Sequence, residues 1–210
     1  MSVEVLPQQN VIRAANVRRA RFLQYFTIGW NSLEAVIGIG FGIVAGSVAL
    51  VGFGVDSVIE SSSGASILWR LFAGDEKEKL ALRLVSISLL VLAAYVAFDA
   101  VKSLILQERP DESYVGIGLA LVSLIVMPLL AREKRKVAAQ LGSRAMQADS
   151  KQTSICAYLS AILLGGLLLN ALGGWWWADP LAALVMIPII AKEGIEALQG
   201  KTCCDTGGCH

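Results

Sequence analysis

Six long, mostly apolar stretches follow one another along this chain and are separated by short polar links. A membrane-spanning helix needs about 20 predominantly apolar residues to cross roughly 30 Å of hydrocarbon, and each stretch comes close to or exceeds that length. We therefore predict an all-α, polytopic membrane protein built as a bundle of six transmembrane helices. The predicted spans are Phe22–Val44, Ser47–Trp69, Ala81–Gln107, Ser113–Ala131, Thr153–Leu172 and Ala178–Leu198.

The composition supports a membrane protein over other classes. Apolar residues make up 55% of the chain and charged residues only 17%, whereas an ordinary soluble domain has about 25% charged residues. A formal net charge of +1 gives no basic footprint for a nucleic-acid partner, and we expect neither an enzyme nor a bound prosthetic group. Three parts are expected: a cytoplasmic N-terminal segment at 1–21, the six-helix domain at 22–200, and a cytoplasmic Cys/His-rich tail at 201–210.

The basic residues predict the orientation in the membrane. Sixteen of the eighteen Lys and Arg residues lie before the first span, at the C-terminal end of the chain, or in the second and fourth links and their flanks. The positive-inside rule makes that side cytoplasmic, so both termini are expected in the cytoplasm. The membrane is expected to be the inner membrane of a prokaryote. The fourth link, predicted at Arg132–Asp149, is expected to be the longest. The consecutive residues Trp175–Trp177 are typical of an interfacial anchor.

Two carboxylates fall inside the second predicted span. Asp56 and Glu60 are four residues apart, which places both side chains on one helical face. Carboxylates in hydrocarbon are costly and are by default a sign of function, and their oxygens suit divalent cations. The pair therefore predicts a cation or proton site, and the alternative is a structural pair that bonds to neighbouring Ser and Thr.

The two halves of the chain share a short internal resemblance. Gly46–Leu50 resembles Gly142–Met146, and spans two and five are predicted to run in opposite directions. Inverted halves with polar residues at matching places are typical of transporters. The same offset of 96 residues places Asp56 on Gln152 and Glu60 on Cys156.

These four residues form a candidate metal site. Four oxygen and sulfur ligands suit a tetrahedral divalent ion such as zinc, and a thiolate shifts the preference towards softer ions such as cadmium. Two alternatives stay open: Cys156 is a small buried hydrophobe, and Asp149, one turn before Gln152, is either a further ligand or the N-cap of the fifth span.

The first span contributes further candidates. Asn31 and Glu34, about one turn apart, are candidates for lining the ion path, although Glu34 could instead bond to a neighbouring helix. Glycines at 38, 42 and 46 form a small-residue row that predicts close helix packing.

The C-terminal tail gathers thiols and the single His of the chain. Cytoplasmic thiols stay reduced, so a disulfide is not expected, whereas thiols and an imidazole suit soft metals. The tail predicts a secondary metal site, and a redox pair or an unstructured end are the alternatives. Its candidate ligands are Cys203, Cys204, Cys209 and His210.

Four segments in sequence order resemble motifs of the cation diffusion facilitator, or cation efflux, family. Its second span carries Gly-Ser-x-Ala-Leu before an Asp-rich metal motif, as do Gly46–Leu50 and Asp56-x-x-x-Glu60 here. Its fifth span carries Ala-Asp-x-x-His-x-x-x-Asp, which corresponds to Ala148–Cys156, with Gln152 and Cys156 in place of the His and the last Asp. Trp176–Pro180 resembles the Trp-Ala-Asp-Pro turn of the family.

The resemblance implies a secondary active transporter that exports divalent heavy-metal cations from the cytoplasm by proton antiport. Metal ions, protons, lipid and a second copy of the chain are the expected partners. Because Gln152 cannot titrate, protons would be carried by Asp56, Glu60, Asp149 or Cys156. The tail stands where the family commonly has a cytoplasmic domain. The alternative is a non-transporting metal sensor or accessory subunit that uses the tail.

Overall fold

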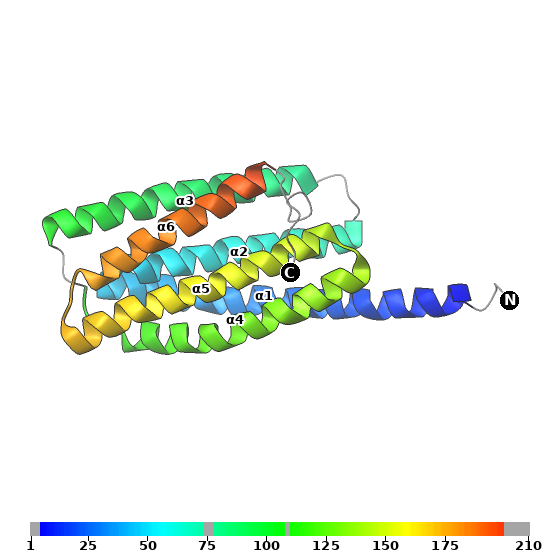
Figure 1. Cartoon of the computed structure of the whole chain (residues 1–210), viewed down its shortest axis with the longest axis horizontal. Coiled ribbons are helices and arrows are strands. Elements are labelled where there is room, and N and C mark those ends of the chain that lie inside the picture. The colour runs from blue at the N-terminus through cyan, green and yellow to red at the C-terminus, as the bar shows by residue number, and fades with distance from the viewer. Residues whose placement is uncertain (1–4, 74–77, 108–109, 200–210) are drawn as a thin grey trace.

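The protein forms one elongated bundle of six α-helices that run side by side (Figure 1). The computed structural model describes residues 5–73, 78–107 and 110–199. The helices are α1 (Val5–Ala45), α2 (Val48–Ala73), α3 (Glu78–Leu106), α4 (Tyr114–Leu141), α5 (Arg144–Gly173) and α6 (Ala178–Leu198). The predicted all-α fold with six helices is therefore confirmed.

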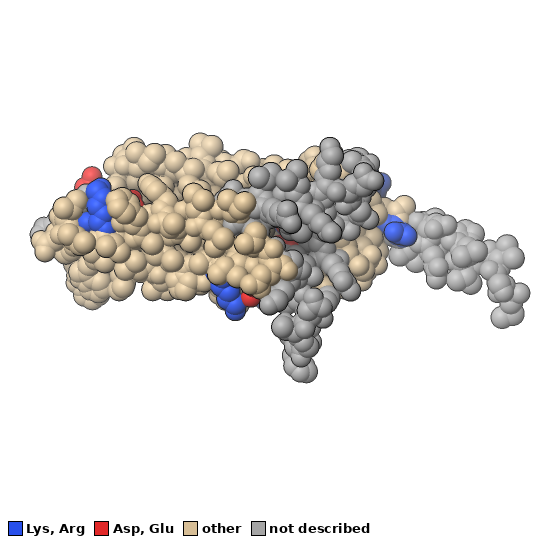
Figure 2. All heavy atoms as spheres, turned by 90° about the horizontal axis from the view of Figure 1, so that it is seen from above, with Lys and Arg blue, Asp and Glu red and all other residues tan. Residues whose placement is uncertain are grey.

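The outer surface of the bundle is largely apolar. Most of the described surface in Figure 2 belongs to uncharged residues, and large side chains such as Val36, Ile105 and Leu172 are more than two-thirds exposed. Three helical segments in the described part of the chain are long and apolar enough to cross a membrane: Arg13–Ala45, Tyr114–Leu141 and Asp149–Gly173. Helices α2, α3 and α6, which the sequence also predicts as spans, lie alongside them in the same bundle.

The helix contacts support the inverted repeat. In each half the first two helices pack together, α1 with α2 and α4 with α5. Across the halves each helix contacts its counterpart: α1 with α4, α2 with α5, and α3 with α6. The two halves therefore face each other as equivalent units, which is how inverted repeats enclose a site.

The same Gly-Ser turn joins the first two helices of each half. Gly46 and Gly142 both have positive φ, +66° and +60°, a conformation that glycine adopts without steric cost. The following serine then caps the next helix: Ser47 Oγ accepts from the Leu50 N–H at 3.1 Å and Ser143 Oγ from the Met146 N–H at 3.3 Å. The two turns lie at opposite ends of the bundle, as an inverted pair requires (Figure 1).

The predicted long link at Arg132–Asp149 is wrong. Helix α4 continues to Leu141 and α5 begins at Arg144, so only Gly142 and Ser143 join them. Residues 133–141 lack Gly and Pro and consist mostly of good helix formers, so their charged side chains belong to a helix and not to a loop. Helix α1 is also longer than its predicted span, because it begins at Val5.

Close packing of α1 against α2 follows from the glycine row, as predicted. A Cβ atom added at Gly42 would lie 2.8 Å from the Val51 nitrogen, and one at Gly38 would lie 3.0 Å from the Gly54 Cα. Only residues without a side chain allow backbones to approach this closely. This contact fixes α2, and with it Asp56 and Glu60, against α1.

Candidate cation site

Buried carboxylates lie in the interior formed by α1, α2, α4 and α5. Asp56 and Glu60 of α2 are 4% and 0% exposed, Glu34 of α1 is 0% exposed, and Asp149 of α5 is 2% exposed. The spacing of Asp56 and Glu60 does place both on the inward face of α2. Since a buried charge is costly without a partner, the surroundings of each carboxylate indicate its use.

Cys156 of α5 lies opposite the two carboxylates of α2. Its free thiol is 1% exposed and lies near the carboxyl groups of Asp56 and Glu60. The offset between the halves thus brings Cys156 next to its counterpart Glu60. Gln152, one turn earlier, is partly buried, and its Nε2 has no hydrogen-bond partner.

Several oxygen atoms around these residues are unpartnered. Glu60 Oε2, Asp149 Oδ1 and Gln24 Oε1 are buried without a hydrogen bond. In the described residues, no three His, Cys, Asp or Glu side chains are arranged so that they could hold a metal ion. The interior therefore offers spare oxygen ligands without a preformed metal site.

Lys134 of α4 is the functional candidate that sequence reasoning missed. Its ammonium group is buried and lies 2.8 Å from Asp149 Oδ2 and 3.9 Å from Glu60 Oε1. The sequence places it in the predicted link, among basic residues expected at the membrane surface. The helical period would have revealed it, because Leu130, Lys134 and Val137 lie on one buried stripe of α4.

Two further side chains complete a cluster around Lys134. Thr153 Oγ1 accepts a hydrogen bond from the ammonium at 2.9 Å and donates one to Glu60 Oε1 at 2.6 Å. Gln24 Nε2 donates to Asp149 Oδ2 at 2.8 Å. This inner cluster, defined as Gln24, Glu60, Lys134, Asp149 and Thr153, joins α1, α2, α4 and α5.

Asp149 is not a helix cap. The N-cap of α5 is Ser143, whose side chain accepts from Met146, and Asp149 lies inside the helix. Of the two roles that the sequence left open for Asp149, only cation binding remains. The structure adds a second candidate role, ion pairing with Lys134.

Glu34 forms a second polar cluster with neighbours on three helices. Its carboxylate accepts hydrogen bonds from Trp30 Nε1 at 2.6 Å, from Ser57 Oγ at 3.2 Å and from Ser123 Oγ. Asn31 is fully buried, and neither its amide nitrogen nor its amide oxygen has a partner. The two candidates for the ion path thus differ: the carboxylate of Glu34 has hydrogen-bond partners, and the amide of Asn31 has none.

Asp179, in the Trp-Ala-Asp-Pro segment, serves the opposite end of the bundle. It is buried and accepts hydrogen bonds from Ser47 Oγ and from the Ala49 N–H at the start of α2. A carboxylate there satisfies free N–H groups and the helix dipole. This motif therefore fixes the start of α6 to the start of α2 and contributes no ligand to the inner cluster.

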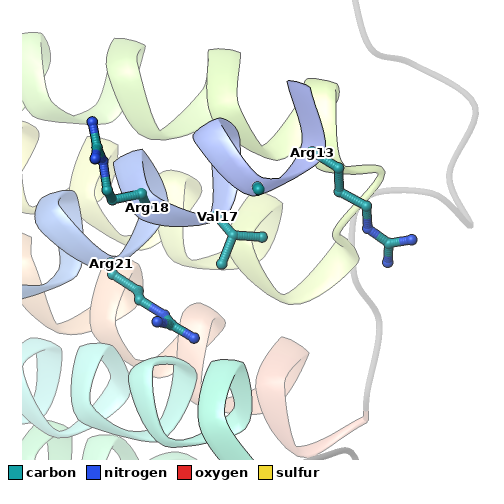
Figure 3. Close-up of a pocket in the computed structure, with 5 residues that line it drawn as sticks. Arg13, Val17, Arg18 and Arg21 are labelled. Atoms are coloured by element: carbon teal, nitrogen blue, oxygen red, sulfur yellow. The ribbon is translucent and has the colours of Figure 1, made fainter. Parts of the chain in front are cut away.

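The N-terminal part of α1 carries a hollow lined by positively charged side chains. It is lined by Arg13, Ala14, Val17, Arg18 and Arg21, whose arginines point in different directions (Figure 3). Arg21 donates to the Leu71 carbonyl of α2 at 3.2 Å. A surface lined by guanidinium groups repels cations, so this hollow is no cation site. The tail ligands Cys203, Cys204, Cys209 and His210 lie outside the described residues.

Comparison with known proteins identifies the relatives of the chain. The profile of the cation efflux transmembrane domain matches residues 26–199. An uncharacterized transporter of Synechocystis is 25% identical over 179 residues, 80% of this chain and 58% of its own length. Transmembrane protein 163 of Xenopus laevis is 21% identical over 188 residues, 87% of this chain and 67% of its own length.

A third relative carries a functional name. The cation-efflux pump FieF of Salmonella arizonae is 28% identical over 174 residues, which are 73% of this chain and 56% of the pump. The chain therefore spans between about half and two-thirds of the length of these relatives.

Proposed function

The chain belongs to the cation efflux family, and from that premise we propose that it is a secondary active transporter that exports divalent heavy-metal cations. Zinc, cadmium or a softer ion would leave the cytoplasm in exchange for protons. The observation that carries the proposal is the pair of buried carboxylates Asp56 and Glu60, which face the thiol of Cys156 inside the bundle.

The donor atoms indicate the class of ion. Asp56 and Glu60 supply carboxylate oxygens, Gln152 an amide oxygen and Cys156 a sulfur, a mixed set that suits zinc and softer divalent ions. Because no three acidic or thiol side chains in the described residues already form a metal site, binding would draw them together around the ion. Asn31 would line the path, since its buried amide is free to contact a passing ion.

Proton exchange follows from the same ligands. A carboxylate or thiol must lose its proton before it binds a metal, so arrival of the cation releases protons. Asp56, Glu60 and Cys156 can make this exchange, and Gln152 cannot. Rocking of the two equivalent halves would then open the site to the other side, where protons reload the acids.

The proposed orientation, oligomeric state and role of the tail complete the picture of the transporter in its membrane. Both termini would lie in the cytoplasm of a prokaryotic cell, with the bundle in its inner membrane as a homodimer. The tail ligands Cys203, Cys204, Cys209 and His210 would capture metal beside the cytoplasmic end.

Removal of both carboxylates tests the proposal. Asp56→Asn with Glu60→Gln should abolish zinc and cadmium uptake into proteoliposomes. It should also abolish the metal resistance that the chain confers on a metal-sensitive host. The matched control is Asp111→Asn with Glu112→Gln, the same two chemical changes at exposed positions between α3 and α4. Transport that survives in the first variant would refute the proposed site.

A further inference from the structure

Lys134 is a cation already present among the acids of the bundle. Its side chain is 0% exposed, and lysine is almost never buried without an anionic partner. The nearest anion is Asp149 at 2.8 Å, and Glu60 is the second at 3.9 Å. The family motifs in the chain include Asp149 and Glu60 but leave Lys134 unexplained.

The ammonium group is held between two carboxylates by unequal contacts. Asp149 gives it a short ion pair and Thr153 accepts a hydrogen bond from it, whereas its approach to Glu60 exceeds hydrogen-bond length. A lysine ammonium is a compact charge on a flexible stem. Loss of Asp149 would therefore let it move onto Glu60, whose second oxygen is buried and unpartnered.

The charges also divide in a consistent way. Asp149 with Lys134 forms a neutral pair, and the carboxylate of Glu34 accepts hydrogen bonds from three neutral donors. This leaves the two carboxylates Asp56 and Glu60 for a divalent ion. Buried charge is tolerated when it is paired, so one divalent cation would complete the pairing. A lysine that moved onto Glu60 would occupy one of these two negative charges and repel the metal.

We propose that Lys134 is a positioning residue for transport, a tethered cation that competes with the metal for Glu60, and that Asp149 acts by holding the ammonium away from Glu60. This inference rests on the proposed function. It gives Asp149 an indirect role, in contrast to the direct ligand role suggested by its place in the family motif. A third reading, in which the pair only stabilises the bundle, makes different predictions for metal affinity.

A double-mutant cycle on Lys134 and Asp149 separates these readings, because the two residues are in contact and should couple. Zinc and cadmium affinities are measured by titration calorimetry of the full chain in nanodiscs. The background carries Cys203→Ser, Cys204→Ser, Cys209→Ser and His210→Ala, so that the tail binds no metal. The variants are Lys134→Met, Asp149→Asn and both together, and Lys136→Met is the control, because Lys136 is exposed and pairs only with Glu133 among the described contacts.

The expected pattern is a rescue. Asp149→Asn should weaken metal binding by at least about tenfold, because the freed ammonium pairs with Glu60. Lys134→Met should tighten binding by about tenfold, because the competitor is gone. The double variant should bind within about threefold of Lys134→Met, and so tighter than the parent, because Asp149 then has no ammonium left to hold, and Lys136→Met should not change the affinity.

Other patterns overturn the inference. If Asp149 is itself a ligand, the double variant stays as weak as Asp149→Asn. If the pair is only structural, the variants lose thermal stability while their metal affinity stays at the parent value. Should Asp149→Asn fail to fold, the double variant alone decides, since it leaves no charge unpaired. A parent chain that binds neither metal would refute the proposed function itself, whereas a binding parent with additive variants refutes only the role of Lys134.

Discussion

The buried polar residues of this bundle fall into two kinds, and the difference lies in their hydrogen bonds. Glu34 receives three donors from α1, α2 and α4, so its carboxylate is satisfied by neutral groups. Glu60 has a buried oxygen without any partner. A satisfied carboxylate joins helices, while an unsatisfied one is costly to bury and is retained where a ligand completes it. We therefore expect Glu34 to hold helices together, and the proposed cation site includes Glu60 and not Glu34.

In the proposed site, Cys156 is the ligand that we expect to set the choice of metal. Replacing the thiol by a carboxylate, as in Cys156→Asp, should shift transport from cadmium towards zinc, because oxygen ligands favour harder ions than sulfur does. We expect the ratio of cadmium to zinc uptake to fall by about tenfold, the order of change that metal sites show when their ligand shell is altered. Proteoliposome uptake of both metals, measured side by side, checks this.

The control for this change is Cys156→Ala, which removes the ligand without adding another. It should lower uptake of both metals, whereas Cys156→Asp should keep zinc uptake. An unchanged cadmium-to-zinc ratio in both variants would show that Cys156 only fills space in the core.

Single residues also show where the sequence was informative. The spacing of Asp56 and Glu60 is local, so one helical turn sufficed to place both on one buried face. Cys156 followed from the internal offset. Lys134 did not, because a lysine within a run of basic residues looks solvent-exposed, and only the path of α4 and the position of Asp149 show that it is buried.

At the level of helices, the contact between α1 and α2 controls the position of the carboxylates. Gly42→Ala should lower stability by about 1–3 kcal/mol, because the added methyl group meets the Val51 backbone nitrogen at 2.8 Å and cannot rotate away. A lowered unfolding temperature in detergent, with weaker metal transport, is the expected result.

Gly40 on the same helix provides the control. A Cβ added there meets nothing within 4 Å, and alanine is the better helix former. Gly40→Ala should leave stability unchanged or raise it by about 0.5–1 kcal/mol. Equal behaviour of the two variants would contradict the close packing of α1 against α2.

Helix existence was predicted better than helix boundaries, and the reason is physical. Apolar length fixes a span, so all six helices were found from the sequence. Their ends are set by caps: Gly142 and Ser143 end α4 and begin α5 by backbone conformation and one hydrogen bond. The polar composition of Arg132–Leu141 indicated the membrane surface but did not show that the helix continues.

For the whole molecule, the two ends of the bundle should lie on opposite sides of the membrane. With the four native cysteines changed to serine, Asp111→Cys and Gln140→Cys each place one thiol at an exposed position, one at either end of α4. A membrane-impermeant maleimide should label Asp111→Cys in intact cells and label Gln140→Cys only after permeabilisation, because the basic end is expected inside. The reverse labelling would invert the proposed direction of export.

The proposed driving force for metal transport, a proton gradient, acts on the whole molecule, since exchange of metal for protons needs both faces of the bundle. Proteoliposomes that are acidic inside should take up zinc or cadmium faster than those without a pH gradient, because protons that leave the acids admit the metal. A pH-sensitive dye should report loss of internal acidity as metal enters, and an ionophore that collapses the gradient should stop uptake. Asp56→Asn with Glu60→Gln should show neither signal. Uptake that persists after the gradient collapses would argue for transport without proton exchange, and the carboxylates would then serve binding alone.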